Sequence, residues 1–114
     1  MPQVVRDIFE KELKDYFDVE DVIVVNSGTS ALIATILSLD LVPTSEIITT
    51  PFTFISTGNA ILFGNGNPVF VDIKEDSKLI NEDLIESKIN ENTKAILPVH
   101  LYGRVCNMPK IQEL

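Results

Sequence analysis

Short apolar, β-branched runs alternate in this chain with stretches whose apolar residues recur every three or four positions. The apolar runs predict four strands, at residues 22–25, 46–50, 68–73 and 94–99. The periodic stretches predict helices at residues 3–17, 28–39, 55–63 and 81–89, and another that starts at residue 108. Strand followed by helix, four times over, is typical of a parallel sheet. We therefore expect an α/β fold of three layers, with a mostly parallel sheet and helices on both of its faces.

The length of the chain is typical of one domain. Its 114 residues are 45% hydrophobic and 23% charged, which is the composition of a folded chain with one core. Residues 1–114 are therefore expected to form a single α/β segment. The last predicted helix begins with Pro109 at a first-turn position, and five residues follow it. We expect this segment to be incomplete.

Charge and cysteine content argue against several classes of function. The formal net charge is −8, from nine Lys and Arg against 17 Asp and Glu, so binding to nucleic acid or to an anionic membrane is not expected. Cys106 is the only cysteine, which rules out an internal disulfide and favours a reducing, cytoplasmic location. No apolar run approaches the ~18 residues that cross a bilayer. His100 is the only histidine and no calcium-loop motif is present, so we predict no metal site.

The turn "NSGTS", residues 26–30, joins the first predicted strand to a helix. Unpaired backbone N–H groups at a helix N-terminus form an anion site, and Gly28 lets the backbone approach a ligand closely. Thr29 and Ser30 add hydroxyl donors for a phosphate oxygen. The motif is neither of the glycine-rich loops that bind nucleoside triphosphates or dinucleotides. Taken alone, the turn is more often a simple helix cap.

Further polar and aromatic residues follow the other predicted strands. Phe52 and Phe54 stand at alternate positions, so in extended backbone one ring points to the core and the other to the opening at the strand end, where it can stack on a flat heteroaromatic ring. Two core rings are the more frequent alternative. Asp72 could orient a ligand but is more often a cap, and His100 could be a general base but is more often a hydrogen-bonded structural group.

Four motifs together resemble a known family. "NSGTSAL", "TTPFTFISTGNAI", "NPVFVDI" and "LPVHLYG", in that order and at these intervals, are similar to the DegT/DnrJ/EryC1/StrS family of pyridoxal-phosphate-dependent aminotransferases. The resemblance covers nearly the whole chain, and four motifs in register are more specific than any one. It implies the amino-terminal part of a fold-type-I large domain, in an enzyme that aminates nucleotide-linked keto-sugars with an amino-acid donor.

The resemblance also implies roles for particular residues. Gly28, Thr29 and Ser30 would bind the phosphate of pyridoxal 5′-phosphate, and Phe54 would stack on its pyridine ring. The family further implies a homodimer, so we expect a homo-oligomer. Arg104 stands where the family often has Gln, which leaves details of the substrate open.

The family's Schiff-base lysine and its pyridinium-binding aspartate have no match in this chain. The seven lysines look like members of solvated faces or loops (Lys11, Lys14, Lys74, Lys78, Lys88, Lys94 and Lys110). We therefore assign no catalytic residue and expect the isolated chain to be inactive. Two alternatives are a non-catalytic binding or regulatory module and one half of a split aminotransferase.

Overall fold

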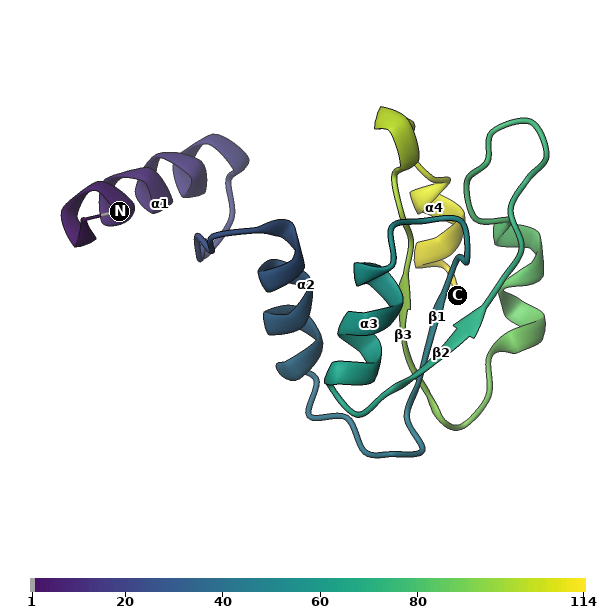
Figure 1. Ribbon diagram of the computed structural model, residues 1–114. Coiled ribbons are helices and arrows are strands. Elements are labelled where there is room, and N and C mark those ends of the chain that lie inside the picture. The colour runs from purple at the N-terminus through teal and green to yellow at the C-terminus, as the bar shows by residue number, and fades with distance from the viewer. Residues whose placement is uncertain (1) are drawn as a thin grey trace.

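The structure, a computed structural model, describes residues 2–114. Its elements run along the chain as four α-helices, three strands and three short 3₁₀ turns (Figure 1). They are α1 (Gln3–Phe17), α2 (Gly28–Leu37), β1 (Glu46–Thr49), α3 (Ser56–Phe63), β2 (Asn67–Phe70), η1 (Glu82–Leu84), η2 (Glu86–Lys88), β3 (Thr93–Leu97), η3 (Leu101–Gly103) and α4 (Met108–Gln112). The expected α/β class is confirmed, and the predicted helices at 3–17, 28–39 and 55–63 are present with small changes in their ends.

The three strands form one parallel sheet in the order β2-β1-β3. Successive residues of β1 face opposite sides, because side chains alternate along a strand. Ile47 packs with Ile36 of α2 and Ile61 of α3, whereas Ile48 packs with Ile85 and with Ile111 of α4. Both faces are therefore covered, which confirms the three-layer architecture.

The strand predicted at residues 22–25 is wrong. This segment is irregular and Ile23 is 83% exposed. A strand needs the backbone of a neighbour to bond with, and among residues 2–114 no strand lies beside this run. The amide of Val24 instead donates to the carboxylate of Glu10, at 2.8 Å from Oε1. The β-branched composition of this run therefore does not correspond to a paired strand.

The helix predicted at residues 81–89 is also wrong, because the segment forms two 3₁₀ turns. Asn81 does cap its first turn, since its side-chain oxygen accepts from the amide of Asp83. Beyond the cap, the amide of Lys88 bonds to the carbonyl of Ile85, three residues back. Ile85 and Glu82 are both buried. Their inward contacts set the path of this segment in place of a regular helix.

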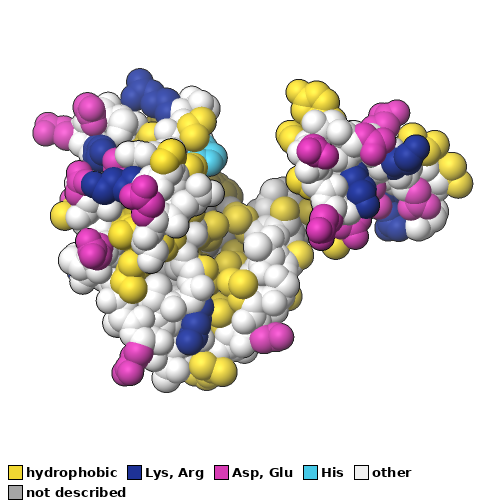
Figure 2. All heavy atoms as spheres, turned by 180° about the vertical axis from the view of Figure 1, so that it is seen from behind, with side chains coloured by type: hydrophobic (Ala, Val, Ile, Leu, Met, Phe, Trp, Pro, Cys, Tyr) yellow, Lys and Arg dark blue, Asp and Glu magenta, His cyan; other side chains and the backbone are white. Residues whose placement is uncertain are grey.

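Helix α1 carries the predicted amphipathic pattern but buries none of its residues. Figures 1 and 2 show it as an arm that stands away from the sheet. The arm exposes an apolar set of residues (Val4, Val5, Ile8, Phe9, Tyr16 and Phe17). No helix within residues 2–114 combines the length and the apolar character that crossing a membrane requires.

Candidate functional site

The candidate site lies at the end of the sheet where the strands finish. Helices α2 and α3 both begin at this end, and the chain turns there after β1 and after β3 (Figure 1). Ligands of open parallel sheets bind beyond the carboxyl ends of the strands. The polar and aromatic motifs singled out in the sequence therefore fall where such a fold binds ligands.

Serine 27 caps helix α2. Its hydroxyl oxygen accepts from the amide of Ser30 at 3.1 Å, and its backbone is extended, as an N-cap requires. The hydroxyl of Ser30 donates to Asn26 Oδ1 at 2.7 Å and lies 3.0 Å from Ser27 Oγ. Ser30 thus holds the shape of the turn, and its proton is directed to Asn26.

The same turn leaves donors free for a ligand. Within residues 2–114 the amides of Gly28 and Thr29 and the hydroxyl of Thr29 have no hydrogen-bond partner. A Cβ added to Gly28 would meet no atom within 4 Å, so packing does not require glycine there. Unpaired amides at the positive end of a helix suit an anion such as a phosphate group.

Both aromatic rings of the "TPFTF" segment are exposed, and neither is in the core. The expectation that one would point inward is wrong, because β1 ends at Thr49 and the chain bends from Pro51 to Thr53. Phe54 is 74% exposed. Its ring lines two open clefts, and the one of about 390 Å³ is formed with Phe52 and with Tyr102.

The turn at residues 26–30 and Phe54 lie at the same end of the molecule but do not line a common cleft. The two clefts that Phe54 lines contain neither Gly28, Thr29 nor Ser30. Helix α2 packs against α3, and its Leu32 and Ile33 lie against the apolar cluster that contains Ile47, on one face of the sheet. Leu101, which lines the cleft together with Tyr102, packs with Ile48 and Ile111 on the other face.

Asp72 and His100 have local structural partners. Asp72 is exposed, and its Oδ1 accepts from the amide of the next residue, Ile73, at 2.8 Å, so it has a local and solvated role. His100 Nδ1 accepts from the amide of Cys106 at 3.1 Å. Tyr102, which was not singled out from the sequence, lines the cleft instead. The available signal was its position in the "HLYG" segment, beside Gly103 and a few residues after the end of β3.

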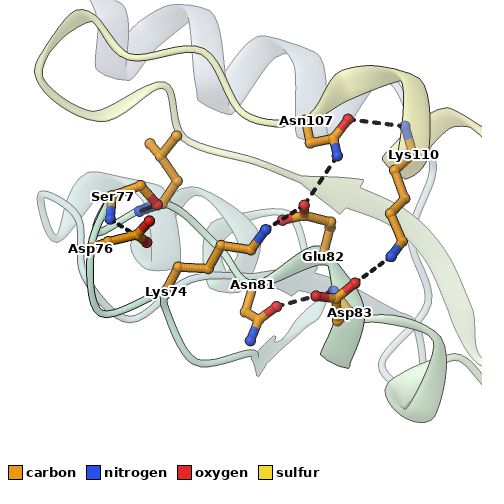
Figure 3. Close-up of polar contacts among 9 residues, drawn as sticks. Lys74, Asp76, Ser77, Asn81, Glu82, Asp83, Asn107 and Lys110 are labelled. Atoms are coloured by element: carbon orange, nitrogen blue, oxygen red, sulfur yellow. Dashed lines mark hydrogen bonds and ion pairs between the residues drawn. The ribbon is translucent and has the colours of Figure 1, made fainter.

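A polar network joins the segment after β2 to helix α4 (Figure 3). Lys74 Nζ lies 2.5 Å from Glu82 Oε1, and Asn107 Nδ2 donates to the same oxygen at 3.1 Å. Lys110 forms an ion pair with Asp83. Lys110 is exposed, as expected for a lysine on a solvated face, whereas Lys74 is half-buried against Glu82 and departs from that expectation.

The electrostatics of the network follow from these contacts. Burial by itself would raise the pKa of the Glu82 carboxyl, but hydrogen bonds from Lys74, the backbone and Asn107 outweigh it and place the pKa below its ordinary value. The hydrogen bond to Glu82 raises the pKa of Lys74. Both groups are therefore charged at neutral pH. Within residues 2–114, no three His, Cys, Asp or Glu side chains are grouped to hold a metal ion.

Comparison with known proteins places the chain among aminotransferases. The model of the DegT/DnrJ/EryC1/StrS aminotransferase family matches residues 5–114. The dTDP-4-amino-4,6-dideoxy-D-glucose transaminase of Escherichia coli is 40% identical over 105 residues, which cover 92% of this chain and 28% of that protein.

Two solved structures extend the comparison to the fold. NtdA from Bacillus subtilis with bound cofactor PMP is 41% identical, with a TM-score of 0.89 over 94% of this chain and 25% of that one. Spr1654 from Streptococcus pneumoniae in its PLP-form is 31% identical, with a TM-score of 0.89 over 95% of this chain and 28% of that one. The chain spans 25–28% of the length of these three relatives.

Proposed function

This chain belongs to the DegT/DnrJ/EryC1/StrS aminotransferase family, and from that premise we propose that it binds pyridoxal 5′-phosphate as part of a sugar aminotransferase. The proposed reaction transfers an amino group from an amino-acid donor to a nucleotide-linked keto-sugar. One observation carries the proposal. The free amides at the start of α2 and the exposed ring of Phe54 occur together at the strand ends.

The residues present fit this cofactor. The amides of Gly28 and Thr29, with the Thr29 hydroxyl, would hold the phosphate at the positive end of α2. Ser30 would hold the turn in shape through Asn26 and Ser27. Phe54 would contact the face of the pyridine ring. When bound, the cofactor supplies the carbonyl group that carries the transferred amine and the ring that takes up its electrons.

We propose that none of the seven lysines of this chain anchors the cofactor covalently. Lys74 and Lys110 are held in ion pairs with Glu82 and Asp83, and a charged amine is a poor nucleophile. The lysine that completes the site would then be supplied by another segment or another chain. Residues 1–114 alone are expected to show no transaminase turnover.

Equilibrium dialysis with pyridoxal phosphate tests the proposal directly. We expect saturable binding to the chain, competition by inorganic phosphate, and no stoichiometric labelling of a single lysine after borohydride reduction and peptide mapping. Absence of saturable binding would overturn the cofactor role of this chain. Stoichiometric labelling of one lysine would overturn the statement that the anchor lies elsewhere.

Replacing Gly28 with alanine separates ligand binding from folding. The new Cβ meets no protein atom within 4 Å, and alanine favours a helix over glycine by up to about 1 kcal/mol, with less in the first turn. The free energy of unfolding is thus expected to stay equal or rise. A phosphate seated on the Gly28 amide would be crowded, so we expect affinity for pyridoxal phosphate to fall about threefold, or ~0.7 kcal/mol. Unchanged affinity in dialysis would show that no ligand approaches this amide.

We further propose that the chain forms a homo-oligomer. Helix α1 exposes Ile8 and Phe9 while burying none of its own residues, and such apolar sets mark interaction surfaces. Light scattering behind a sizing column is expected to give at least twice the mass of one chain. Ile8→Glu should lower the measured molar mass toward that of a single chain, whereas Lys11→Glu should leave it unchanged. A monomer of unchanged mass in both variants would contradict the proposal.

A cytoplasmic location belongs to the same proposal. Cys106 is buried and free, and its Sγ donates to the carbonyl of Val99 at 3.2 Å. Burial raises the pKa of the Cys106 thiol, so it stays protonated and unreactive. Cell fractionation with an antibody to the chain tests the location.

A further inference from the structure

The turn after β3 holds a tyrosine in a backbone conformation that tyrosine rarely adopts. Tyr102 has φ 53° and ψ 33°, and Gly103 follows with φ 76°. The left-handed region costs a bulky residue free energy that glycine avoids. Tyr102 is also 85% exposed. Its ring therefore gains no core packing in exchange for the strained backbone, and such strain is concentrated at functional sites.

Contacts on both sides fix this turn. The amide of Leu101 donates to the carbonyl of Val99 at 2.9 Å, and the amide of Arg104 donates to the carbonyl of Leu101 at 3.0 Å. The amide of Cys106 donates to His100 Nδ1 at 3.1 Å. The ring of Tyr102 is thus presented to solvent from an ordered turn, which limits the entropy lost when a ligand contacts it.

The ring of Tyr102 lines the cleft that Phe52 and Phe54 line from the other loop. This cleft lies between the turn after β1, which leads into α3, and the turn after β3. We infer that Tyr102 is a second ring-contacting residue of the site. It contacts the flat heteroaromatic ring that Phe54 also contacts, so that loops after β1 and β3 enclose one ring between them. The inference rests on the proposed function and adds a ligand contact to it.

Tyr102→Gly tests this contact without imposing backbone strain. Glycine adopts the left-handed region freely, so the melting temperature is expected to change by no more than about 4 °C. Affinity for pyridoxal phosphate, measured by equilibrium dialysis, is expected to fall about fivefold, as for loss of one aromatic stacking partner. Tyr102→Phe keeps the ring and should restore affinity to within about twofold of the unchanged chain. Inorganic phosphate has no ring, so its inhibition constant should be the same in all three proteins.

The outcomes separate this inference from the function on which it rests. If Phe54→Ala weakens binding of pyridoxal phosphate but Tyr102→Gly does not, Tyr102 makes no ring contact and the proposed function stands. If Tyr102→Gly weakens pyridoxal phosphate and inorganic phosphate equally, the turn has a structural role and the inference is overturned. If the unchanged chain shows no saturable binding of pyridoxal phosphate, the proposed function and this inference fail together.

Discussion

Replacing Phe54 with alanine is expected to weaken binding of pyridoxal phosphate by about tenfold or more, because base–aromatic stacking contributes roughly 1–3 kcal/mol per ring. The fold should be unaffected. Phe54 is exposed, and substitutions of exposed side chains usually change the free energy of unfolding by no more than about 0.5 kcal/mol. Equilibrium dialysis gives the affinity and urea denaturation gives the stability.

Phe63 is the matched control for this prediction. It is the last residue of α3, at the far end of the helix from Phe54, and it is 65% exposed. Phe63→Ala removes a ring of similar exposure that lies away from the candidate site. The affinity of this variant for pyridoxal phosphate should therefore equal that of the unchanged chain. Phe54→Tyr should also bind normally, because stacking requires only an aromatic face. Equal affinities in Phe54→Ala and Phe63→Ala would show that Phe54 is not part of the site.

The elements that could be predicted from the sequence are those whose signals are local. Helix α3 and strands β1 and β3 follow from residue periodicity and β-branched runs, and each has the partners that its pattern requires. The run at 22–25 has the same composition as a strand but no neighbouring strand among the described residues. A single run of sequence carries no information about whether a partner lies beside it.

In the candidate site too, the features that could be predicted are those formed by residues contiguous in the sequence. The turn at Gly28 could be predicted because cap, glycine and helix are contiguous in the sequence. The cleft that joins Phe54 to Tyr102 could not, because its two loops are far apart in the chain and the left-handed backbone at Tyr102 is set by its turn. The inward position of Glu82 was missed for a related reason. Its partners Lys74 and Asn107 lie eight and 25 residues away along the chain.

Replacing Glu82 with alanine is expected to lower the free energy of unfolding by about 2 kcal/mol, since breaking hydrogen bonds to a charged group costs roughly 1.5–3 kcal/mol. The carboxylate is only 6% exposed and accepts from both Lys74 and Asn107. Its loss therefore leaves two donors without their acceptor and a space in the core. Urea denaturation followed by circular dichroism measures the change.

Glu86→Ala is the control, because Glu86 is exposed on the second 3₁₀ turn and is expected to change stability by no more than about 0.5 kcal/mol. The double variant Lys74→Met with Glu82→Leu should lose less than Glu82→Ala, since it leaves no charge unpaired. If Glu86→Ala lowered the free energy of unfolding as much as Glu82→Ala, the hydrogen bonds of Glu82 to Lys74 and Asn107 would not account for the loss.

The contribution of Glu82 should depend on pH in a direction fixed by its pKa. Its pKa in the folded chain is below the ordinary value of 4.5, so the unfolded state takes up the proton first as the pH falls. The stabilisation is fully present above about pH 4.5 and is lost as the pH falls through the lower folded pKa. The pKa of Lys74 is above 10.5, so the lysine side of the pair loses its charge only above that pH.

The difference in unfolding free energy between the unchanged chain and Glu82→Gln should therefore be constant from pH 6 to 8 and shrink below about pH 4.5. A difference that persisted undiminished at low pH would mean that Glu82 acts through its shape and not through its charge.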